Sequence, residues 1–440
     1  MEDGRRVTDY SFEEFPEDVQ LSIVSFLTPE EAGNFSCTSK RFSELYRDGR
    51  SRLWRSLCDR RWGHVTTISV WGQGNVSYKL LYRILHGWEK LLGFWRPCGS
   101  NAQRSFGPYS QQAKPPTLVF FEWGPWFLSG SRVYPVEDGT HHVVKKPFLW
   151  MWITSDGQVR SYLNLDGNID EQLDLRISNF DLDLIPVNVN LIGCTHLKVE
   201  VDSVFGYGMS HGEDSGSNYD EEYGNNRRCP EETREIYEYY ANRRCSNGFR
   251  RQRKKDQGRQ ERIRRQRQWE TEHFIKIVDS SPTPDRPLQG LWKGVSEDRK
   301  LEFYLVTYDG LGLSCRRIAD LSERLASCKP VFWTAHPTLF EGPLQPEDAL
   351  IYDSRIHLQP LSAQCYQTKP STVTHFMLIN SSYDLVLSGL TELFKNPWRV
   401  EGRIWQYKNG TFGFGFLRDN FIVDLMHVSN NGHLLDVAEL

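Results

Sequence analysis

Apolar residues near the N-terminus recur at every fourth position. Phe15, Val19, Ile23 and Leu27 follow this spacing, which places their side chains on one face of an α-helix. Pro16 suits the first turn of that helix, because its missing N–H would have no partner there in any case. The pattern therefore predicts an amphipathic helix with one continuous apolar face.

A capping motif predicts that a second helix begins directly afterwards. Thr28, Pro29 and Glu31 stand at the N-cap, first and third positions of a capping box. In this motif the Thr and Glu side chains each accept a hydrogen bond from a backbone N–H of the other residue. The apolar side of the second helix then includes Phe35.

A third helix is expected after Thr38 or Ser39, either of which can serve as its N-cap. A Leu53-Trp54 pair closes the segment. Three short helices within about 45 residues carry more apolar surface than they can bury among themselves. Two interpretations remain open at this point: a small helical subdomain packed on its own chain, or a module that buries its surplus surface against a partner.

This segment resembles an F-box. The family pattern has an apolar-Pro pair and an acidic residue, then apolar residues at helical spacing, a Pro-led second helix, a Lys-Arg-aromatic step and a terminal Leu-Trp. Phe replaces the usual Leu before the first Pro, and Phe stands where Trp is common in the third helix. Both changes keep a bulky apolar group. The matching positions are Phe15-Pro16, Asp18, Val19, Ile23, Leu27, Pro29, Lys40-Arg41-Phe42 and Leu53-Trp54.

The resemblance implies a substrate receptor of an SCF-type ubiquitin ligase. In that role the F-box, here residues 9–57, docks onto a Skp-family adaptor, and the adaptor links it to a cullin and a RING protein. The chain itself would be non-catalytic and would hold a protein substrate, through its C-terminal part, close to the ubiquitin-carrying enzyme. The residues expected to bind the adaptor are Phe15, Pro16, Val19, Ile23, Leu27, Pro29, Phe35, Leu53 and Trp54.

A linker with its own helix is expected over residues 58–92. Ser77 can cap this helix, and a broad apolar stripe follows. Such a helix would join the N-terminal module to the rest of the chain, and a rigid joint would fix the distance between the two. The stripe consists of Leu80, Leu81, Ile84, Leu85, Trp88 and Leu92.

From residue 93 onward the pattern changes to that of β-strands, with aromatic and β-branched residues between turn dipeptides. Asp156-Gly157 and Asn409-Gly410 are two-residue hairpin signals, as are Asp138-Gly139 and Asp309-Gly310. Many antiparallel strands joined by tight turns favour a barrel or sandwich, because closure removes exposed edges. The expected strands are 118–121, 126–136, 148–154, 159–165, 187–192, 197–201, 301–307, 313–318, 354–358, 373–379, 403–407, 412–416 and 421–428.

A weak internal repeat bears on how many β-units form. Gly93-Phe94-Trp95 is echoed by Gly290-Leu291-Trp292, and a strand-rich segment follows each. Two related β-units or one large barrel would both fit, and the single barrel, split into residues 93–205 and 276–440, is favoured. The fold class is therefore α+β. Its glycine- and tryptophan-rich β-domain is similar to that of plant F-box proteins with a lone β-barrel rather than a repeat array.

A charged insertion separates the two β-parts, over residues 206–275. Residues 211–238 hold nine acidic and three basic residues, whereas 250–267 hold ten basic and two acidic ones. Such a composition buries little apolar surface and predicts disorder. The basic run has three readings: a solvated, partly helical loop, a nuclear-import signal, or a nucleic-acid contact. The last is unlikely because aromatic stacking partners are few.

The 440 residues contain no convincing catalytic constellation. There is no GxSxG, P-loop or HExxH motif, and no metal site or cofactor is expected. The adjacent pair His141-His142 is interpreted as part of a surface hairpin. Most of the aromatic residues at 120–127, 150–152, 333 and 405 are expected in the core, with a few left to bind ligands.

Composition limits the remaining possibilities. Net charge is −4, and the nine cysteines are scattered without a CxxC pair, which favours free thiols in a reducing compartment. No apolar run approaches the ~18 residues that span a bilayer. Nucleus and/or cytoplasm is the expected location. The alternative to a ligase receptor is a β-barrel ligand-binding or hydrolytic protein whose N-terminal helices form a cap. A receptor requires an exposed apolar helical face, whereas a cap buries that face.

Overall fold

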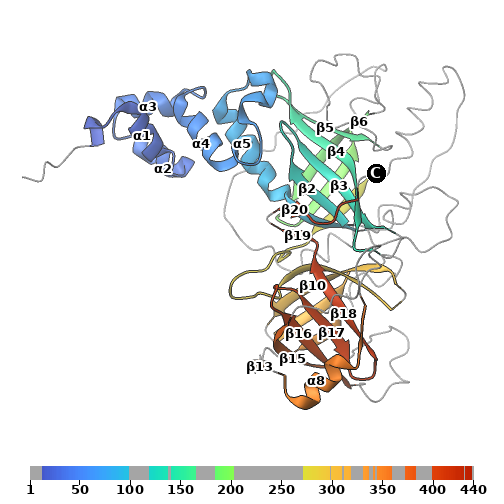
Figure 1. Cartoon of the computed structure of the whole chain (residues 1–440). Helices are drawn as coiled ribbons and strands as arrows, with labels where there is room; N and C mark the ends of the chain where they lie inside the picture. Colours follow the sequence, from blue (N-terminus) through green and yellow to red (C-terminus); the bar gives the residue numbers. More distant parts are fainter. Residues whose placement is uncertain are drawn as a thin grey trace, which may run out of the picture. The chain divides into compact units, whose positions relative to one another are not determined.

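The computed structural model forms two compact units (Figure 1). One consists of Met1–Leu92, Phe121–Gly130 and Phe148–Pro186, and the other of Gly93–Phe120, Ser131–Pro147 and Val187–Leu440. The residues that the structure describes are 12–98, 118–136, 140–164, 184–202, 271–297, 299–309, 312–318, 331–335, 340–341, 344–358, 372–382, 399–430 and 432–438.

The first unit begins with the predicted helices. The capping box is present: the Glu31 N–H donates to Thr28 Oγ1 over 3.2 Å, and the Thr28 N–H donates to Glu31 Oε2 over 2.8 Å. The Thr28 backbone N–H and the Thr28 hydroxyl both donate to Glu31 Oε2, and these two bonds lower the pKa of the Glu31 carboxyl. Three short helices were expected in this segment, and the structure adds a fourth, α4, which begins at Arg52 and ends at Trp62. The helices are η1 (Phe12–Glu14), α1 (Glu17–Val24), α2 (Pro29–Ser36), α3 (Lys40–Arg47), α4 (Arg52–Trp62), η2 (Ile68–Gly74), α5 (Tyr78–Trp88) and η3 (Glu89–Leu91).

The predicted linker helix, α5, packs on α4 through charged and aromatic contacts. Ser77 caps α5 as expected, accepting from the Leu80 N–H. Arg61 on α4 makes a two-pronged contact with Glu89, each N···O distance being 2.7 Å. Trp62 Nε1–H donates to the same carboxylate over 2.7 Å. This shared carboxylate ties the end of α4 to the end of α5.

Within the same unit, the segment between α4 and α5 is attached to barrel residues. The Thr66 hydroxyl donates to the Gly124 carbonyl over 2.7 Å, and the Thr67 N–H donates to the Pro125 carbonyl over 3.0 Å. Trp71, which is 1% exposed, donates its indole N–H to Thr66 Oγ1 over 3.0 Å. The segment between α4 and α5 is therefore joined to residues 121–130 by hydrogen bonds and a buried Trp.

Eight antiparallel strands close a barrel in sequence order. β8 pairs with both β7 and β1, so the charged insertion interrupts this barrel before its last strand. Residues 206–270 of that insertion lie outside the described residues. The strands are β1 (Gly93–Cys98), β2 (Leu118–Trp123), β3 (Leu128–Pro135), β4 (Val143–Ile153), β5 (Val159–Asn164), β6 (Leu184–Ile192), β7 (His196–Val201) and β8 (Glu272–Lys276).

The remaining long strands form a second sheet, with the order β12-β11-β10-β9-β18-β17-β16-β15-β13. β12 also pairs with β15, and β14 pairs in parallel with β18. Short helix α8 (Pro346–Asp353) was not predicted. The strands are β9 (Gly290–Val295), β10 (Leu301–Asp309), β11 (Gly312–Arg317), β12 (Val331–Ala335), β13 (Phe340–Glu341), β14 (Ile356–Leu358), β15 (Val373–Ser382), β16 (Arg399–Tyr407), β17 (Phe412–Phe416), β18 (Phe421–His427), β19 (Ser429–Asn430) and β20 (His433–Leu434).

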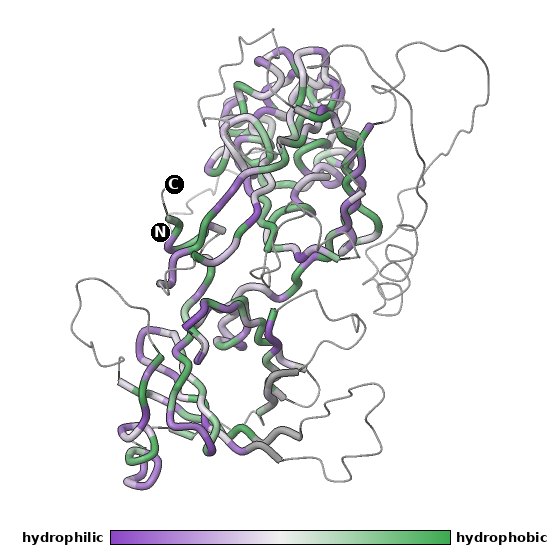
Figure 2. The backbone as a smooth tube through the Cα atoms, turned by 90° about the vertical axis from the view of Figure 1, so that its right-hand side faces the viewer, coloured by the Kyte–Doolittle hydropathy of each residue, from purple (hydrophilic) through white to green (hydrophobic). Residues whose placement is uncertain are grey.

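The single split barrel favoured from the sequence is therefore wrong, and the alternative of two β-units is observed. The internal repeat marks the first strand of each sheet: Gly93 opens β1 of the barrel and Gly290 opens β9 of the second sheet. Both have positive φ, +95° and +141°, which only glycine adopts readily. The Trp two residues later, Trp95 or Trp292, is fully buried in each case. Figure 2 shows hydrophobic and hydrophilic residues alternating along the strands.

Two predicted turn glycines have the left-handed backbone, with φ of +84° at Gly157 and +83° at Gly410. The Gly410 N–H donates to the Tyr407 carbonyl over 3.0 Å, and the Tyr407 N–H donates to the Thr411 carbonyl over 2.8 Å. The loop therefore spans residues 408–410, one residue longer than the expected two-residue turn. Such loops carry glycine at their last position, where the chain re-enters the strand with positive φ. Parts of the turns predicted at Asp138-Gly139 and Asp309-Gly310 lie outside the described residues.

His141 is a buried residue of the second unit, 7% exposed, rather than part of a surface hairpin. Its Nδ1 lies 2.8 Å from Met426 Sδ, and its Nε2 has no hydrogen-bond partner. Burial, followed by the positive charge of Lys293, lowers the pKa of His141 to about 4, against smaller opposing effects of nearby carboxylates, chiefly that of Asp436. The neighbouring His142 is exposed.

We expect this buried imidazole to make the fold sensitive to acid. The unfolded chain takes up a proton near the ordinary His pKa of about 6.5, whereas the folded chain resists protonation down to about pH 4. Stability is therefore complete above the unfolded pKa and falls as pH decreases through this window, by about 1 kcal/mol between pH 7 and 5.5. Chemical denaturation at several pH values should show this slope, and His141→Phe should reduce it. The matched control His142→Phe should leave it unchanged. An identical slope in wild type and His141→Phe would contradict the assignment.

Candidate partner-binding face of the N-terminal helices

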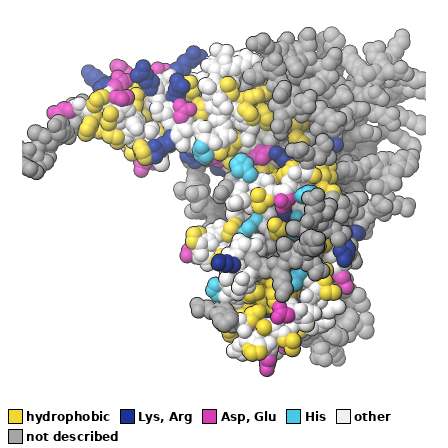
Figure 3. All heavy atoms as spheres, viewed as in Figure 1, with side chains coloured by type: hydrophobic (Ala, Val, Ile, Leu, Met, Phe, Trp, Pro, Cys, Tyr) yellow, Lys and Arg dark blue, Asp and Glu magenta, His cyan; other side chains and the backbone are white. Residues whose placement is uncertain are grey.

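Helix α1 has an apolar face that its own chain buries and a second that it leaves open. Leu21 and Val24 are 5% and 2% exposed and belong to the core of the helical region. Val19 and Ile23, four residues apart, are 37% and 46% exposed, and Phe15 is 40% exposed. The predicted spacing of four thus describes the outer face of the helix. Figure 3 shows hydrophobic side chains gathered along one edge of these helices and Lys and Arg side chains along the other.

Phe26 extends this open face and was missed in the sequence. It is 65% exposed, and the Arg60 guanidinium carbon lies 3.0 Å from the centre of its ring. The signal was present, because Phe26 follows Ile23 by three residues and so lies on the same helical side. We define the open face as Phe15, Val19, Ile23 and Phe26.

Residues beside the open face are partly exposed and structurally supported. Leu27, Pro29 and Phe35 are half-buried, and Pro16 is exposed at the N-cap of α1. The Phe35 ring lies 4.8 Å from the Phe42 ring, between centroids, in an aromatic cluster that includes Phe12. The Gln20 amide, buried in α1, donates to the Phe12 carbonyl over 2.9 Å. These contacts hold α1, α2 and α3 together behind the open face.

Leu53 and Trp54 are core residues, which corrects their place in the predicted binding set. They are 2% and 3% exposed and so have no surface to offer a partner. The Trp54 indole N–H donates to the Tyr46 carbonyl over 2.8 Å. Its ring packs against Tyr46 and Tyr82 with centroid distances of 5.2 and 5.8 Å. Trp54 therefore connects α3, α4 and α5 from within.

The aromatic residues singled out in the β-region divide between core and surface. Phe120, Phe121, Trp333 and Trp405 are each at most 2% exposed. Others, at the barrel end that belongs to the first unit, are half-buried and pack on one another. The rings of Trp126 and Trp152 lie 6.3 Å apart, and Trp152 stacks on Tyr162 at 4.9 Å between centroids. The half-buried residues are Trp123, Trp126, Phe127, Trp150 and Trp152.

Among the described residues, the structure gives little support for a reactive cysteine or a metal-binding site. No cluster of three or more His, Cys, Asp or Glu there could hold a metal ion. The described cysteines are free thiols. Burial raises the pKa of the Cys58 thiol to about 12 and that of Cys315 well above its ordinary value, so neither thiol ionises readily at neutral pH. In the described part of the chain, no helix has the length and apolarity needed to cross a membrane.

Comparison with known proteins agrees with this geometry. The F-box-like family model matches residues 12–60, which contain the open face, helices α1 to α3 and most of α4, and the chain belongs to the F-box protein family. It is 41% identical over 435 residues to F-box protein At3g12350 of Arabidopsis thaliana, an alignment that covers 97% of this chain and 98% of the relative. F-box proteins are typically non-catalytic substrate adaptors of SCF-type ubiquitin ligases, and this membership supports that general role here.

Proposed function

We propose that this chain is the substrate-recognition subunit of an SCF-type ubiquitin ligase, and that its open face binds a Skp-family adaptor. The observation that supports this proposal most directly is the exposure of the open face. Phe15, Val19, Ile23 and Phe26 are 37–65% exposed, although the helices have a packed core of their own. Monomeric proteins seldom leave such a contiguous apolar stripe in water, and a partner interface is the usual reason. The adaptor would in turn connect the chain to a cullin and a RING protein.

The β-region would select the protein substrate. Its half-buried aromatic group, including Trp126 and Trp152, offers the amphipathic rings that protein interfaces favour. In the first unit, Thr66 and Trp71 attach the helices to the barrel residues 121–130 that include this Trp126. A fixed attachment would hold the substrate at a constant distance from the adaptor. Ubiquitin transfer would then gain from proximity without a catalytic residue in this chain.

The test is binding of the purified full chain to a Skp-family adaptor, measured by calorimetry, beside an Ile23→Asp variant. Ile23 is 46% exposed, so the change should leave the fold intact. A carboxylate in the apolar seam would lose its hydration without gaining a partner. We expect the variant to bind at least about 30-fold more weakly, corresponding to about 2 kcal/mol.

Leu350→Asp is the matched control. Leu350 on α8 is 71% exposed, lies outside the F-box-like match, and undergoes the same chemical change. It should bind the adaptor like the wild type. Absence of binding by folded wild-type protein would reject the ligase-receptor function and favour the β-barrel as the functional part. Equal weakening by both variants would show that the open face is not the binding surface.

A further inference from the structure

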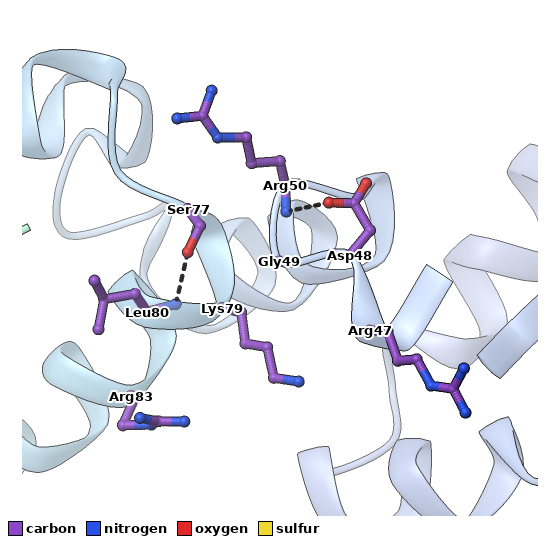
Figure 4. A pocket seen from close by; sticks show the side chains of 8 residues that line it. All are labelled: Arg47, Asp48, Gly49, Arg50, Ser77, Lys79, Leu80 and Arg83. Carbon is purple, nitrogen blue, oxygen red and sulfur yellow. Dashed lines mark hydrogen bonds between the residues drawn. The ribbon is translucent and has the colours of Figure 1, made fainter. Parts of the chain in front are cut away.

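A basic pocket lies where the turn between α3 and α4 meets the start of α5. Its cavity volume is about 480 Å³, and its lining includes Arg47, Asp48, Arg50, Lys79 and Arg83. Four cations and one carboxylate leave a net charge of +3. Lys79 and Arg83 are four residues apart on α5 and therefore share a helical face. Figure 4 shows the Lys79 side chain between Arg83 on one side and Arg47 on the other, with Arg50 extending away from all three.

The cations of this pocket are not neutralised by the described part of the chain. Arg47, Lys79 and Arg83 take part in none of its ion pairs. Arg50 donates instead to the Asn75 carbonyl over 2.7 Å. The carboxylate of Asp48 accepts from the Arg50 backbone N–H over 3.0 Å. Like charges held together in this way repel one another, and an anion would relieve the repulsion.

Lys79 is held in place without losing its charge. Its ammonium nitrogen lies 4.7 Å from the centre of the Tyr46 ring and 5.3 Å from that of Trp54. It is 3.5 Å from the Tyr46 carbonyl oxygen. Aromatic faces attract a cation but carry no negative charge, so the ammonium stays available to an anion.

The N-terminus of α5 contributes the electric field of its helix dipole to the pocket, but not hydrogen-bond donors. The Lys79 N–H donates to the Gly49 carbonyl over 3.0 Å, and the Leu80 N–H donates to Ser77 Oγ. These amides are therefore already used. The positive end of the helix dipole still favours negative charge in the pocket. The side chains must supply the contacts to a ligand.

We propose that this pocket binds a phosphoryl group, with Lys79 and Arg83 as its contacts. A single carboxylate would offset one of three net charges, whereas a phosphoryl group carries about −1.5 to −2 at neutral pH. Guanidinium groups bind its oxygens in a two-pronged geometry. The group could arrive as a free oligophosphate anion or on a phosphorylated serine. The lining of the pocket contains no residue of the open face, so the site is separate from the proposed adaptor-binding surface.

The test is calorimetric titration of the full chain, without adaptor, with pyrophosphate and separately with N-acetyl-phosphoserine amide. We expect saturable one-site binding of at least one probe, weakening as salt increases. Lys79→Gln and Arg83→Gln should each weaken it about tenfold or more, since each removes a charge-assisted hydrogen bond. Lys79→Arg should retain it. Pyrophosphate binding alone would identify a free anion as the ligand, and phosphoserine binding would identify a phosphorylated chain.

Arg55→Gln is the matched control, because Arg55 is exposed on α4, pairs with Asp59 and lies outside the pocket. It should bind within about twofold of the wild type. Arg83→Gln keeps the test valid if loss of Lys79 disturbs Tyr46 and Trp54, because these rings contact the Lys79 ammonium and make no cation–π contact with Arg83. Absence of saturable binding of both probes, or equal weakening by Arg55→Gln, would overturn the proposal. Adaptor binding is measured separately and does not enter this outcome.

Discussion

Trp54→Ala is expected to lower the free energy of unfolding of the helical region by about 3–5 kcal/mol. Trp54 is 3% exposed, and its loss would open a cavity between α3, α4 and α5. It would also leave the Tyr46 carbonyl without its 2.8 Å hydrogen bond from the indole. Adaptor binding should decrease together with stability, because the open face depends on this packing.

Thermal unfolding and hydrogen exchange of the N-terminal helices would measure this effect. Phe26→Ala is the control on the same helices: the ring is 65% exposed, so its removal should change stability by no more than about 1 kcal/mol, mainly through the lost Arg60 contact. Ile23→Asp should lose adaptor binding at unchanged stability. If Trp54→Ala lost binding while its melting temperature stayed constant, Trp54 would be a contact residue, as the sequence alone suggested.

Asp424→Ala is expected to destabilise the second sheet by about 3 kcal/mol. Asp424 on β18 is 7% exposed. Its carboxylate accepts from the Tyr407 hydroxyl over 2.5 Å and lies 2.9 Å from His357 Nδ1. Burial and this carboxylate raise the pKa of Tyr407, so the phenol remains protonated and donates. Removing the carboxylate would cost the buried Tyr407 hydroxyl its hydrogen bond to Asp424 and leave it only the neighbouring Tyr352 hydroxyl.

Urea unfolding of the full chain, followed by fluorescence of the buried Trp residues, would test this expectation. Tyr407→Phe removes the donor and keeps the ring, so it should cost less, about 1–2 kcal/mol. Asp353→Ala is the matched control, since Asp353 is exposed at the end of α8. Equal stability of Asp424→Ala and wild type would show that the network contributes little to the sheet.

Sequence patterns predicted the local elements because their causes are local. Thr28 and Glu31 form a capping box through backbone groups three residues apart, and Ser77 caps α5 for the same reason. The turn at Gly410 requires a positive φ that glycine supplies. Helical spacing also placed Val19 and Ile23 on one face of α1. The exposed part of the candidate binding face could therefore be read almost completely, with Phe26 as the omission.

The periodicity of the sequence identified which positions are apolar. It did not identify which of these side chains are buried by other helices or strands. Leu53 and Trp54 have the same apolar character as Ile23, yet α5 and Tyr46 bury Trp54. Burial of His141 likewise depends on residues more than a hundred positions away, Lys293 and Met426. No local signal specifies such contacts.

The sequence by itself determined most of the N-terminal helices, their caps, most strands, the turn glycines and the outer stripe of α1, because these follow from backbone chemistry and from spacing within a few residues. The tertiary structure alone decided that two β-units form rather than one, since strand pairing such as β8 with β1 joins residues about 180 positions apart. Tertiary packing also determined which apolar side chains remain exposed to solvent, and it placed Arg47, Lys79 and Arg83 around one pocket. Long-range packing selects among pairings that local preference leaves equivalent.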